Sequence, residues 1–265
     1  MGAISGPPSR MSGRIALITG GGGGIGAATA QLFAEEGARV AIVDVDLPTV
    51  EKAAAAIAGA VPGATILPLA ADVAQEAEAR RAVDATVARF GALHTVVNVA
   101  GIRVYTPLAE ATTDDWQRIL GVNLLATTYG CQAALPHLRA AGDGTIVNVS
   151  SVFGVMGRAG MGQYDTTKAA ILGFSRALAV EEAPHGIRVN TVCPAGTITP
   201  YHIRRAADRG VSEDELRRSR AADNGLFGRW AEPREVAYPI LFLACRESSF
   251  VTGATLMVDA GRSIL

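Results

Sequence analysis

A run of glycines between an apolar segment and an amphipathic one constrains the fold of this chain more than any other feature. Residues 14–19 (RIALIT) predict a short buried strand, residues 20–26 (GGGGGIG) follow, and residues 27–36 have the apolar spacing of a helix. Glycines let a backbone turn sharply and approach a pyrophosphate, which binds at the N-terminus of the next helix. A glycine run alone would also suit a flexible linker, but the flanking strand and helix favour a dinucleotide-binding loop.

The remainder of the chain repeats this alternation. We expect strands at 14–19, 39–43, 66–71, 94–99, 145–149, 187–193 and 255–258. Helices are expected between them at 27–36, 47–59, 75–90, 112–140, 163–182 and 233–245. The alternation predicts an α/β fold, with a doubly wound, Rossmann-type parallel sheet of about seven strands and helices on both faces.

The length of 265 residues suits one large α/β domain. We expect residues 12–265 to form a single dinucleotide-binding domain, preceded by a disordered tail at 1–11. The polar segment 194–230 has Gly and Pro at its ends and helical spacing only in its middle. Because long insertions after a strand end often cover a substrate, we expect a lid at about 197–230, although its charges would equally suit a solvated face.

Composition and charge narrow the range of partners. The net charge is −1, so nothing marks a nucleic-acid-binding surface. The three cysteines are scattered, which suits a reducing compartment and offers no metal-ligand spacing. The apolar stretch 53–71 is interrupted by glycines and prolines, and the N-terminus lacks a signal pattern. We therefore expect a cytoplasmic protein that acts on a small molecule, with no metal, nucleic-acid or membrane partner.

Two acidic residues follow strands beside the glycine loop. Asp44 ends the second strand 18 residues after Gly26, close to the ~20 expected of an acid that binds the adenosine ribose hydroxyls. A helix N-cap or an ordinary loop acid is the alternative for Asp44. Asp72 and Val73 end the third strand, where they would meet the adenine.

Tyr164 and Lys168 are four residues apart in an expected helix, which places both side chains on one face. An ammonium about 4 Å from a phenol favours the phenolate by roughly 4 kcal/mol at an effective dielectric of 20, and so lowers the phenol pKa toward the range of efficient general acid–base catalysis. The chain uses Arg for 22 of its 24 cations, so a Lys here indicates a need for a compact ammonium. The alternative is an accidental surface pair. Ser151 ends the fifth strand, where its hydroxyl could hold a substrate oxygen beside the phenol.

Three further polar residues lie inside predicted elements. Asn98, in the fourth strand, could tie neighbouring strands together. Asn123 lies in a helix interior, where Asn is unfavourable. Its side chain is either exposed to solvent or buried and holding a water, and the sequence favours neither alternative. His94 is expected to be a strand-edge residue with no role.

With these residues placed, the chain resembles the short-chain dehydrogenase/reductase family over about residues 12–265. The motif Thr19-Gly20-x-x-x-Gly24-x-Gly26 is similar to the family's cofactor loop, and Asp72-Val73 to its adenine contact. Asn98-Val99-Ala100-Gly101 resembles its Asn-Asn-Ala-Gly turn, with Val99 in place of the second Asn. The stretch 194–200 (PAGTITP) resembles its Pro-Gly-x-x-x-Thr-Pro segment, with Ala195 where the family usually has Gly. The resemblance thus implies cofactor binding by Gly20, Gly24, Ile25, Gly26, Asp44, Asp72, Val73, Asn98, Ala100, Gly101, Tyr164, Lys168, Pro194, Thr197 and Thr199.

The same resemblance implies a catalytic tetrad of Asn123, Ser151, Tyr164 and Lys168, and the 13-residue gap to Tyr164 selects Ser151 over its neighbour Ser150. In the implied mechanism Tyr164 exchanges a proton with the substrate oxygen, which Ser151 holds. Lys168 binds the nicotinamide ribose and lowers the Tyr164 pKa, while Asn123 positions a water in a proton relay beyond Lys168.

The activity implied is that of an NAD-dependent oxidoreductase that interconverts a secondary alcohol and a ketone. NAD is favoured over NADP because the Asp44 carboxylate would repel a 2′-phosphate. The alternatives are a 3-oxoacyl carrier-protein reductase, which would favour the phosphorylated cofactor, and a nucleotide-binding interaction module that has lost catalysis. The resemblance also implies a homotetramer in which helices 112–140 and 163–182 pair across a two-fold axis.

Residues that follow strand ends should line the substrate pocket, because ligands bind there in doubly wound sheets. The mixture of apolar walls, arginines and hydrogen-bonding rings indicates a small polar substrate, such as a hydroxy acid, polyol or sugar; arginines that point to solvent are the alternative. The expected pocket residues are Arg103, Tyr105, Ser151, Val152, Phe153, Arg158, Tyr201 and His202.

Overall fold

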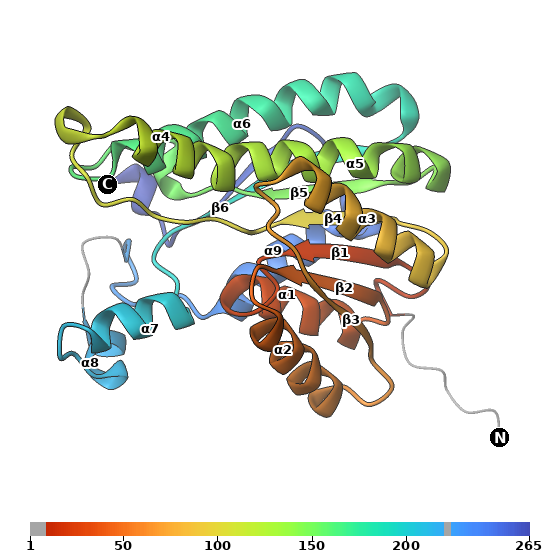
Figure 1. Ribbon diagram of the computed structural model, residues 1–265, viewed down its shortest axis with the longest axis horizontal. Coiled ribbons are helices and arrows are strands. Elements are labelled where there is room, and N and C mark those ends of the chain that lie inside the picture. The colour runs from red at the N-terminus through yellow and green to blue at the C-terminus, as the bar shows by residue number, and fades with distance from the viewer. Residues whose placement is uncertain (1–8, 220–223) are drawn as a thin grey trace.

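The computed structural model describes residues 9–219 and 224–265. Seven strands, all parallel, form one sheet in the order β3-β2-β1-β4-β5-β6-β7 (Figure 1). The strands are β1 (Ile15–Thr19), β2 (Arg39–Asp44), β3 (Thr65–Ala70), β4 (Thr95–Asn98), β5 (Thr145–Val149), β6 (Arg188–Pro194) and β7 (Thr255–Val258). The predicted doubly wound parallel sheet is therefore confirmed, and the seven expected strands agree with those observed to within a residue at each end.

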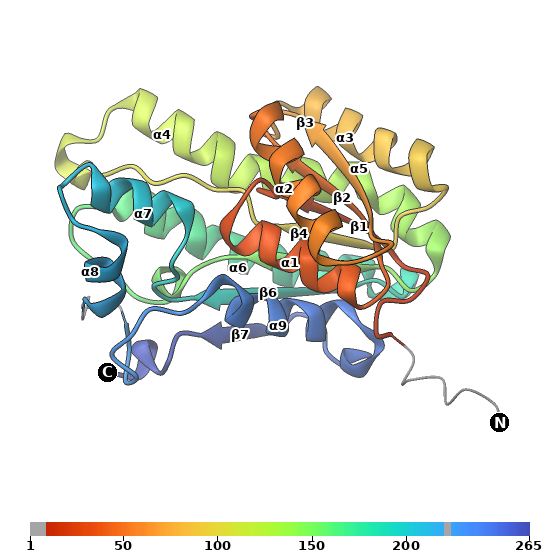
Figure 2. The ribbon, with the colours of Figure 1, turned by 90° about the horizontal axis from the view of Figure 1, so that it is seen from below.

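Helices cover both faces of this sheet (Figures 1 and 2). Helices α1, α2 and α9 pack on one face, and α3, α5 and α6 pack on the other. The central strands β1, β4 and β5 are buried along their whole length, as expected of strands that are covered on both sides. The helices are α1 (Gly24–Glu35), α2 (Leu47–Ala60), α3 (Glu76–Phe90), α4 (Thr113–Leu120), α5 (Ala126–Ala141), α6 (Gly162–Glu182), α7 (Pro200–Ala207), α8 (Glu213–Arg218) and α9 (Pro233–Ala244).

The long helix expected at 112–140 is divided in the structure. Helix α4 and helix α5 are joined by one π-helical turn, Gly121–Leu125, with Asn123 at its centre. Single π turns inside helices are frequent at functional sites. Asn123 is fully buried in this turn.

The N-terminal boundary of the domain differs from the one predicted. Residues 1–8 of the expected disordered tail lie outside the described residues, but Arg10 and Met11 are packed. Met11 is fully buried in the core with α1 and α9, and its N–H donates to Glu36 O at 3.0 Å. The Arg10 guanidinium pairs with Glu247 near the C-terminus. The sequence does not predict that Arg10 and Met11 are packed, because they directly follow a Gly- and Pro-containing stretch.

Helices α7 and α8 stand beyond the carboxyl ends of the strands, away from the two helical layers (Figures 1 and 2). They occupy much of the segment expected to be a lid at about 197–230; residues 220–223 of that segment lie outside the described residues. In the described part of the chain, no helix is long and apolar enough to cross a membrane.

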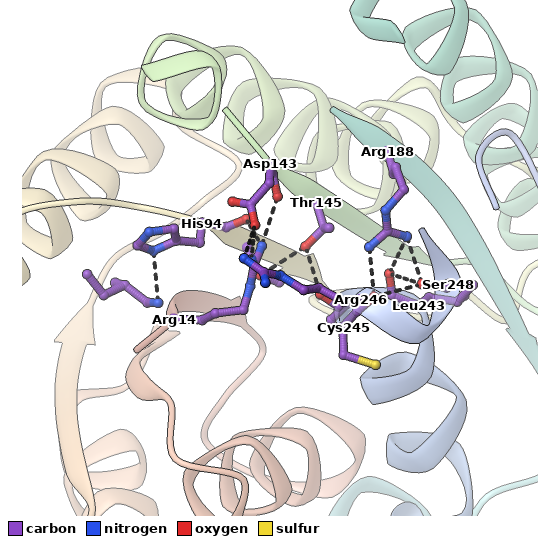
Figure 3. A network of polar contacts seen from close by, with 12 residues as sticks. Arg14, His94, Asp143, Thr145, Arg188, Leu243, Cys245, Arg246 and Ser248 are labelled. Carbon is purple, nitrogen blue, oxygen red and sulfur yellow. Dashed lines mark hydrogen bonds and ion pairs between the residues drawn. The ribbon is translucent and has the colours of Figure 1, made fainter. Parts of the chain in front are cut away.

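A polar network joins the strands at the opposite, amino-terminal edge of the sheet (Figure 3). Arg14 pairs with Asp143 at 2.7 Å and also donates to the carbonyl of His94. His94 Nδ1 accepts a hydrogen bond from the N–H of Ile15 at 3.1 Å. Burial and the charge of Arg14 lower the pKa of His94, which favours the neutral ring that this bond needs. The expectation that His94 has no role is therefore wrong: the ring helps to hold β1 beside β4.

In the same network, Arg188 at the start of β6 hydrogen-bonds to the C-terminal end of α9 (Figure 3). Its guanidinium donates to Leu243 O at 2.9 Å, to Cys245 O at 3.0 Å and to Ser248 Oγ at 2.7 Å. A cation is favourable at this position because the last carbonyls of a helix lack partners within the helix.

Replacing Arg188 with Met is expected to lower the free energy of unfolding by about 3 kcal/mol, because the acceptors at the helix end lose a charged donor. Denaturant unfolding at a fixed protein concentration measures the change. Arg246→Met is the matched control, because its side chain is 89 % exposed and lies 3.7 Å from Asp143, so its loss should cost less than about 1 kcal/mol. Equal losses in the two variants would contradict this assignment.

Candidate active site

The site lies at the carboxyl ends of β1 and β4, where the strand order reverses direction. Ligands bind at such a switch point in doubly wound sheets. Thr19 ends β1, and its Oγ1 accepts hydrogen bonds from the N–H groups of Val99 and Ala100 after β4, at 3.1 and 3.2 Å. These bonds place the glycine loop beside the turn formed by residues 98–101. Val99 contributes through its backbone, so the departure from a second Asn leaves the turn intact.

The glycine loop has the close approaches that only glycine permits. Gly20 has a φ of +67°, in the left-handed region that glycine adopts most readily. A Cβ on Gly26 would lie 2.1 Å from the carbonyl oxygen of Gly20, so a larger residue would force the loop away from α1. Gly24 and the half-buried Ile25 begin α1, whose N-terminus faces the loop. This geometry suits a pyrophosphate.

Asp44 lies against the glycine loop. Its Oδ2 accepts a hydrogen bond from Gly22 N–H at 3.0 Å, and its Oδ1 accepts one from Val45 N–H at 2.8 Å. The N-cap of α2 is Asp46, whose side chain accepts from Thr49 N–H, so the N-cap alternative for Asp44 is wrong. The carboxylate is thus held at the end of β2, beside the loop.

Asp72 and Val73 follow β3, the edge strand next to β2. Asp72 is exposed, and its Oδ1 accepts from Ala74 N–H at 3.1 Å, while Val73 is half-buried. Both residues therefore lie at the carboxyl edge of the sheet, on the same side of the switch point as Asp44.

Tyr164 and Lys168 meet Ser151 as the spacing predicts. Tyr164 is in the first turn of α6, Lys168 is one turn later, and both side chains are buried. The accidental surface pair is thus excluded. The Lys168 ammonium donates to Val149 O at 2.9 Å and lies 5.7 Å from the centre of the Tyr164 ring. Ser151, two residues after β5, offers the Tyr164 hydroxyl a hydrogen bond that lowers the Tyr164 pKa, and its Oγ accepts from Phe153 N–H at 3.2 Å.

Nearby positive charges and burial have opposite effects on the pKa of Tyr164. Burial raises the pKa of Tyr164, but the positive charges of Lys168 and Arg103 and the hydrogen bond from Ser151 outweigh it, so the pKa of Tyr164 lies below its ordinary value. Burial also lowers the pKa of Lys168, which the phenol partly counteracts. A phenol with a lowered pKa next to a substrate hydroxyl can act as a general base.

Asn123 is a buried polar residue rather than an exposed one. Its Oδ1 accepts from Ile102 N–H at 2.7 Å, and its Nδ2 donates to Ile102 O and to Thr167 Oγ1 at 3.1 and 3.0 Å. A Cβ on Gly101 would lie 3.3 Å from Asn123 Oδ1 and 3.4 Å from Lys168 Nζ, so the amide and the ammonium flank this glycine closely. Asn123 therefore fixes the chain after β4 against α6.

Asn98 ties strands together, as its position in β4 suggested. Its Nδ2 donates to Asn148 Oδ1 of β5 at 2.8 Å, and Asn148 in turn donates to Ser175 of α6 at 2.9 Å. The Asn98 side chain also contacts Cys131 of α5. These interactions show a structural use of the side chain and leave a cofactor contact of Asn98 a prediction.

The segment after β6 approaches the glycine loop. Thr199 is the N-cap residue of α7, and a Cβ on Gly24 would lie 2.9 Å from its methyl carbon. Thr199 Oγ1 is 2.9 Å from His202 Nδ1, and the buried Thr197 bonds to Ala195 O at 3.2 Å. Ala195 does not have a positive φ, so the methyl group in place of the usual Gly introduces no backbone strain here. Thr199 thus lies beside the start of α1, and the cofactor contacts of Pro194, Thr197 and Thr199 stay predictions.

A pocket of about 490 Å³ opens beside Ser151, beneath α7. Six of the predicted substrate residues line it: Arg103, Tyr105, Ser151, Phe153, Arg158 and His202. Tyr201 is not part of the lining but donates from its hydroxyl to that of Tyr105 at 2.8 Å. Val152 is fully buried behind the pocket. Arg103 and Arg158 lie over the Tyr164 ring, with guanidinium carbons 5.5 and 5.1 Å from its centre.

Several pocket residues were not predicted from the sequence, chiefly Arg205, Arg209 and Trp230. Tyr201, Arg205 and Arg209 recur every four residues, but this spacing would equally suit a solvated face. Trp230 carries no such signal; the bridge between Thr197 and Ala231 brings it to the pocket.

A buried Tyr–Lys pair next to a dinucleotide loop is typical of one class of nucleotide-dependent oxidoreductase. The known proteins to which this chain is similar belong to that class. The family model described as enoyl-(acyl carrier protein) reductase matches residues 21–263. The chain is 37% identical over 256 residues to 2,5-dichloro-2,5-cyclohexadiene-1,4-diol dehydrogenase LinX of Sphingobium indicum, covering 97% of this chain and 98% of the relative. It is 40% identical over 249 residues to cis-4-hydroxycyclohexanecarboxylate dehydrogenase of Sinomonas cyclohexanicum, covering 94% and 96%.

A solved dehydrogenase structure is also similar to this chain along almost its whole length. The aldohexose dehydrogenase of Thermoplasma acidophilum superimposes with a TM-score of 0.85 at 32% identity, covering 98% of this chain and 97% of that one. The chain belongs to the short-chain dehydrogenase/reductase family. It is therefore an oxidoreductase that uses a nicotinamide cofactor. The glycine loop at the N-terminus of α1 and the carboxylate of Asp44 beside it fit such a dinucleotide.

Proposed function

We propose that this protein oxidises a secondary alcohol to a ketone with NAD, on a small polar substrate. The observation that carries the proposal is the buried Tyr164 phenol, which lies beside Lys168 and next to Ser151, a residue that lines the pocket. The relatives named above act on cyclic alcohols, which supports a substrate of that size.

Each residue of the site has a distinct part in this reaction. Tyr164 accepts the proton of the substrate hydroxyl, and Ser151 holds the same oxygen in place. Lys168 keeps the phenol pKa low and binds the nicotinamide ribose, and Asn123 positions the backbone and a water beyond the ammonium. A bound nicotinamide would supply the hydride acceptor for the carbon that bears the hydroxyl.

The arrangement of pocket residues supports a polar substrate. Arg103 and Arg158 border the pocket rather than pointing away from it. Tyr105 and His202 offer hydrogen-bonding groups, which an aliphatic or steroid-like substrate would leave unpaired on closure, at about 1–3 kcal/mol each. We propose further that α7 and α8, at about 197–230, act as the lid of a catalytic domain spanning 12–265.

The alternatives are less well supported. A 3-oxoacyl carrier-protein reductase would need room for a 2′-phosphate beside Asp44, and the relatives above are dehydrogenases of cyclic alcohols. An inactive binding module would not need Ser151, Tyr164 and Lys168 to converge in one buried cluster.

The proposed function is tested by a spectrophotometric screen. Secondary alcohols and their ketones, including cyclic diols, hydroxy acids and sugars, are offered with NAD, NADH, NADP and NADPH, and reduced nicotinamide absorbance is followed. At least one polar secondary alcohol should reduce NAD. A preparation that binds NAD but turns over none of them, while oxidising or reducing another functional group, would overturn the proposal.

A homotetramer is the proposed assembly in a reducing, cytoplasmic setting. Helix α6 exposes the small residues Ala169, Gly173 and Ala177 at four-residue spacing, and Val180, in the last turn of this helix, is 76% exposed. Small residues permit close helix packing across a two-fold axis.

Light scattering at micromolar concentration is expected to give about four times the chain mass of 27.3 kDa. Replacing Ala177 with Arg should dissociate the α6 contact, because a long charged side chain cannot be accommodated between closely packed helices. Lys52→Arg, on the exposed face of α2, is the control that should leave the mass unchanged. A single 27.3 kDa species in the unaltered protein would exclude the assembly.

A further inference from the structure

Among the described residues that line the pocket, positive charges outnumber negative ones. The described lining includes four arginines and no aspartate or glutamate: Arg103, Arg158, Arg205 and Arg209. Arg158 is neutralised by Asp165, with Nε and Oδ1 3.3 Å apart. For the other three, no ion pair with a described carboxylate is present within 4 Å. Like charges gathered without a counter-charge are unfavourable, so a folded chain that keeps them gains by binding an anion.

Arg205, in the last turn of α7, and Arg209, just after this helix, both line the pocket. The guanidinium carbon of Arg205 lies 3.5 Å from the centre of the Tyr105 ring, and Tyr105 accepts a hydrogen bond from Tyr201 of the same helix. Stacking on an aromatic face fixes the plane of a guanidinium while leaving its N–H groups free at the edge. Burial, and then the charges of Arg209 and Arg103, lower the pKa of Arg205, which shows that the three guanidinium groups are near one another.

We propose that Arg205 and Arg209 form a subsite for the anionic group of the substrate, a carboxylate, sulfonate or phosphate, with Arg103 between this subsite and Tyr164. The proposal rests on the proposed function and specifies its substrate as an alcohol with an acidic group remote from the hydroxyl. Phe153, Met161 and Trp230 also line the pocket, and they suit an apolar or ring-shaped body of the substrate.

His202 does not supply the positive charge of this subsite. Burial, and then the charge of Arg103, lower the pKa of His202 to about 4, so the ring is neutral near pH 7. The charge preference of the pocket should therefore not change between pH 6 and 8, as expected for arginine, whose pKa is above 12.

The structural alternative is that these arginines only stabilise the last turn of α7, as cations do at helix C-termini. Arg204 tests this alternative, because it is in the same turn, is exposed and does not line the pocket. A change that affects Arg205 and Arg209 but not Arg204 separates ligand binding from helix stabilisation.

The first experiment measures binding without turnover. Cyclohexanecarboxylate and its neutral carboxamide, neither of which has a hydroxyl to oxidise, are titrated into the NAD-loaded protein by calorimetry, and cyclohexanesulfonate and cyclohexyl phosphate identify the preferred anion. At least one anion should bind at least tenfold more tightly than the carboxamide. In Arg205→Gln/Arg209→Gln that preference should fall to less than threefold, while Arg204→Gln should keep it.

The second experiment measures turnover. Values of kcat/KM for 4-hydroxycyclohexanecarboxylate and 4-hydroxycyclohexanecarboxamide should differ at least tenfold in the unaltered protein, and the double variant should lose the difference through KM rather than kcat. No anion binding more tightly than the carboxamide, or an equal effect of Arg204→Gln, overturns the subsite.

The two proposals fail in different ways. Equal turnover of the acid and the amide would leave alcohol oxidation standing and overturn the subsite. Tight, Arg205-dependent anion binding without oxidation of any alcohol would establish the subsite and overturn the proposed function.

Discussion

Replacing Tyr164 with Phe is expected to lower kcat by about 10²–10⁴-fold, the usual contribution of a general acid or base. The ring remains, so the packing of the buried side chain against its neighbours is kept, and only the hydroxyl that bonds to Ser151 is lost. The Kd for NAD, measured by calorimetry, should change by less than about threefold. A variant that keeps more than about a tenth of the original kcat would show that Tyr164 is not the proton acceptor.

The pH dependence of kcat/KM shows whether a loss of activity in the Phe variant is due to the loss of the titrating phenol. In alcohol oxidation the phenolate is the active form, so kcat/KM should rise as the pH increases through the Tyr164 pKa and level off above it. Because Lys168, Arg103 and Ser151 lower that pKa, the rise should be complete below the ordinary phenol value of about 10. The Phe variant should lose the rise from its residual activity. Tyr129→Phe, which changes a phenol on the exterior helix α5, should lose neither activity nor the pH profile.

The sequence predicted the fold well because its signals are local and agree with one another. Each strand is an apolar run bounded by turn residues, and the strand–glycine–helix unit requires close backbone approaches such as the 2.1 Å that would separate a Cβ on Gly26 from the Gly20 carbonyl. The pairing of Tyr164 with Lys168 was predictable for the same reason, since one helical turn sets their spacing.

Features that depend on distant contacts were not predictable. Asn123 was placed within a helix, but whether it would be buried depended on a π turn and on the backbone of Ile102, which lies 21 residues away. Met11 follows a Gly- and Pro-containing stretch, yet α1 and α9 provide a site in the core for its side chain. The pocket arginines of α7 could be read as a solvated face until the helix was seen to cover the site. In each case the partner lies far along the chain, where periodicity carries no information.

The glycine loop and Asp44 together predict a preference for NAD over NADP of at least ~10²-fold in kcat/KM. The Asp44 carboxylate is held at the loop by Gly22 N–H and Val45 N–H, so it has little freedom to move away from a ligand. A 2′-phosphate carries nearly two negative charges, and at about 4 Å its repulsion by a carboxylate is several kcal/mol even at an effective dielectric of 20. Residues 20–26 and 45–51 contain no Lys or Arg that could offset this repulsion.

Asp44→Ser should lower that preference at least tenfold, chiefly by improving the use of NADP, because the hydroxyl keeps a hydrogen-bonding group but removes the charge. Asp46→Ser is the matched control: it removes a carboxylate two residues away that caps α2, and a serine can still accept from Thr49 N–H. Steady-state kinetics with both cofactors measures the ratio in the three proteins. Equal kcat/KM for NAD and NADP in the unaltered protein would refute the assignment of Asp44. An equal change in both variants would mean that total negative charge near the loop, rather than the position of the Asp44 carboxylate, sets the cofactor preference.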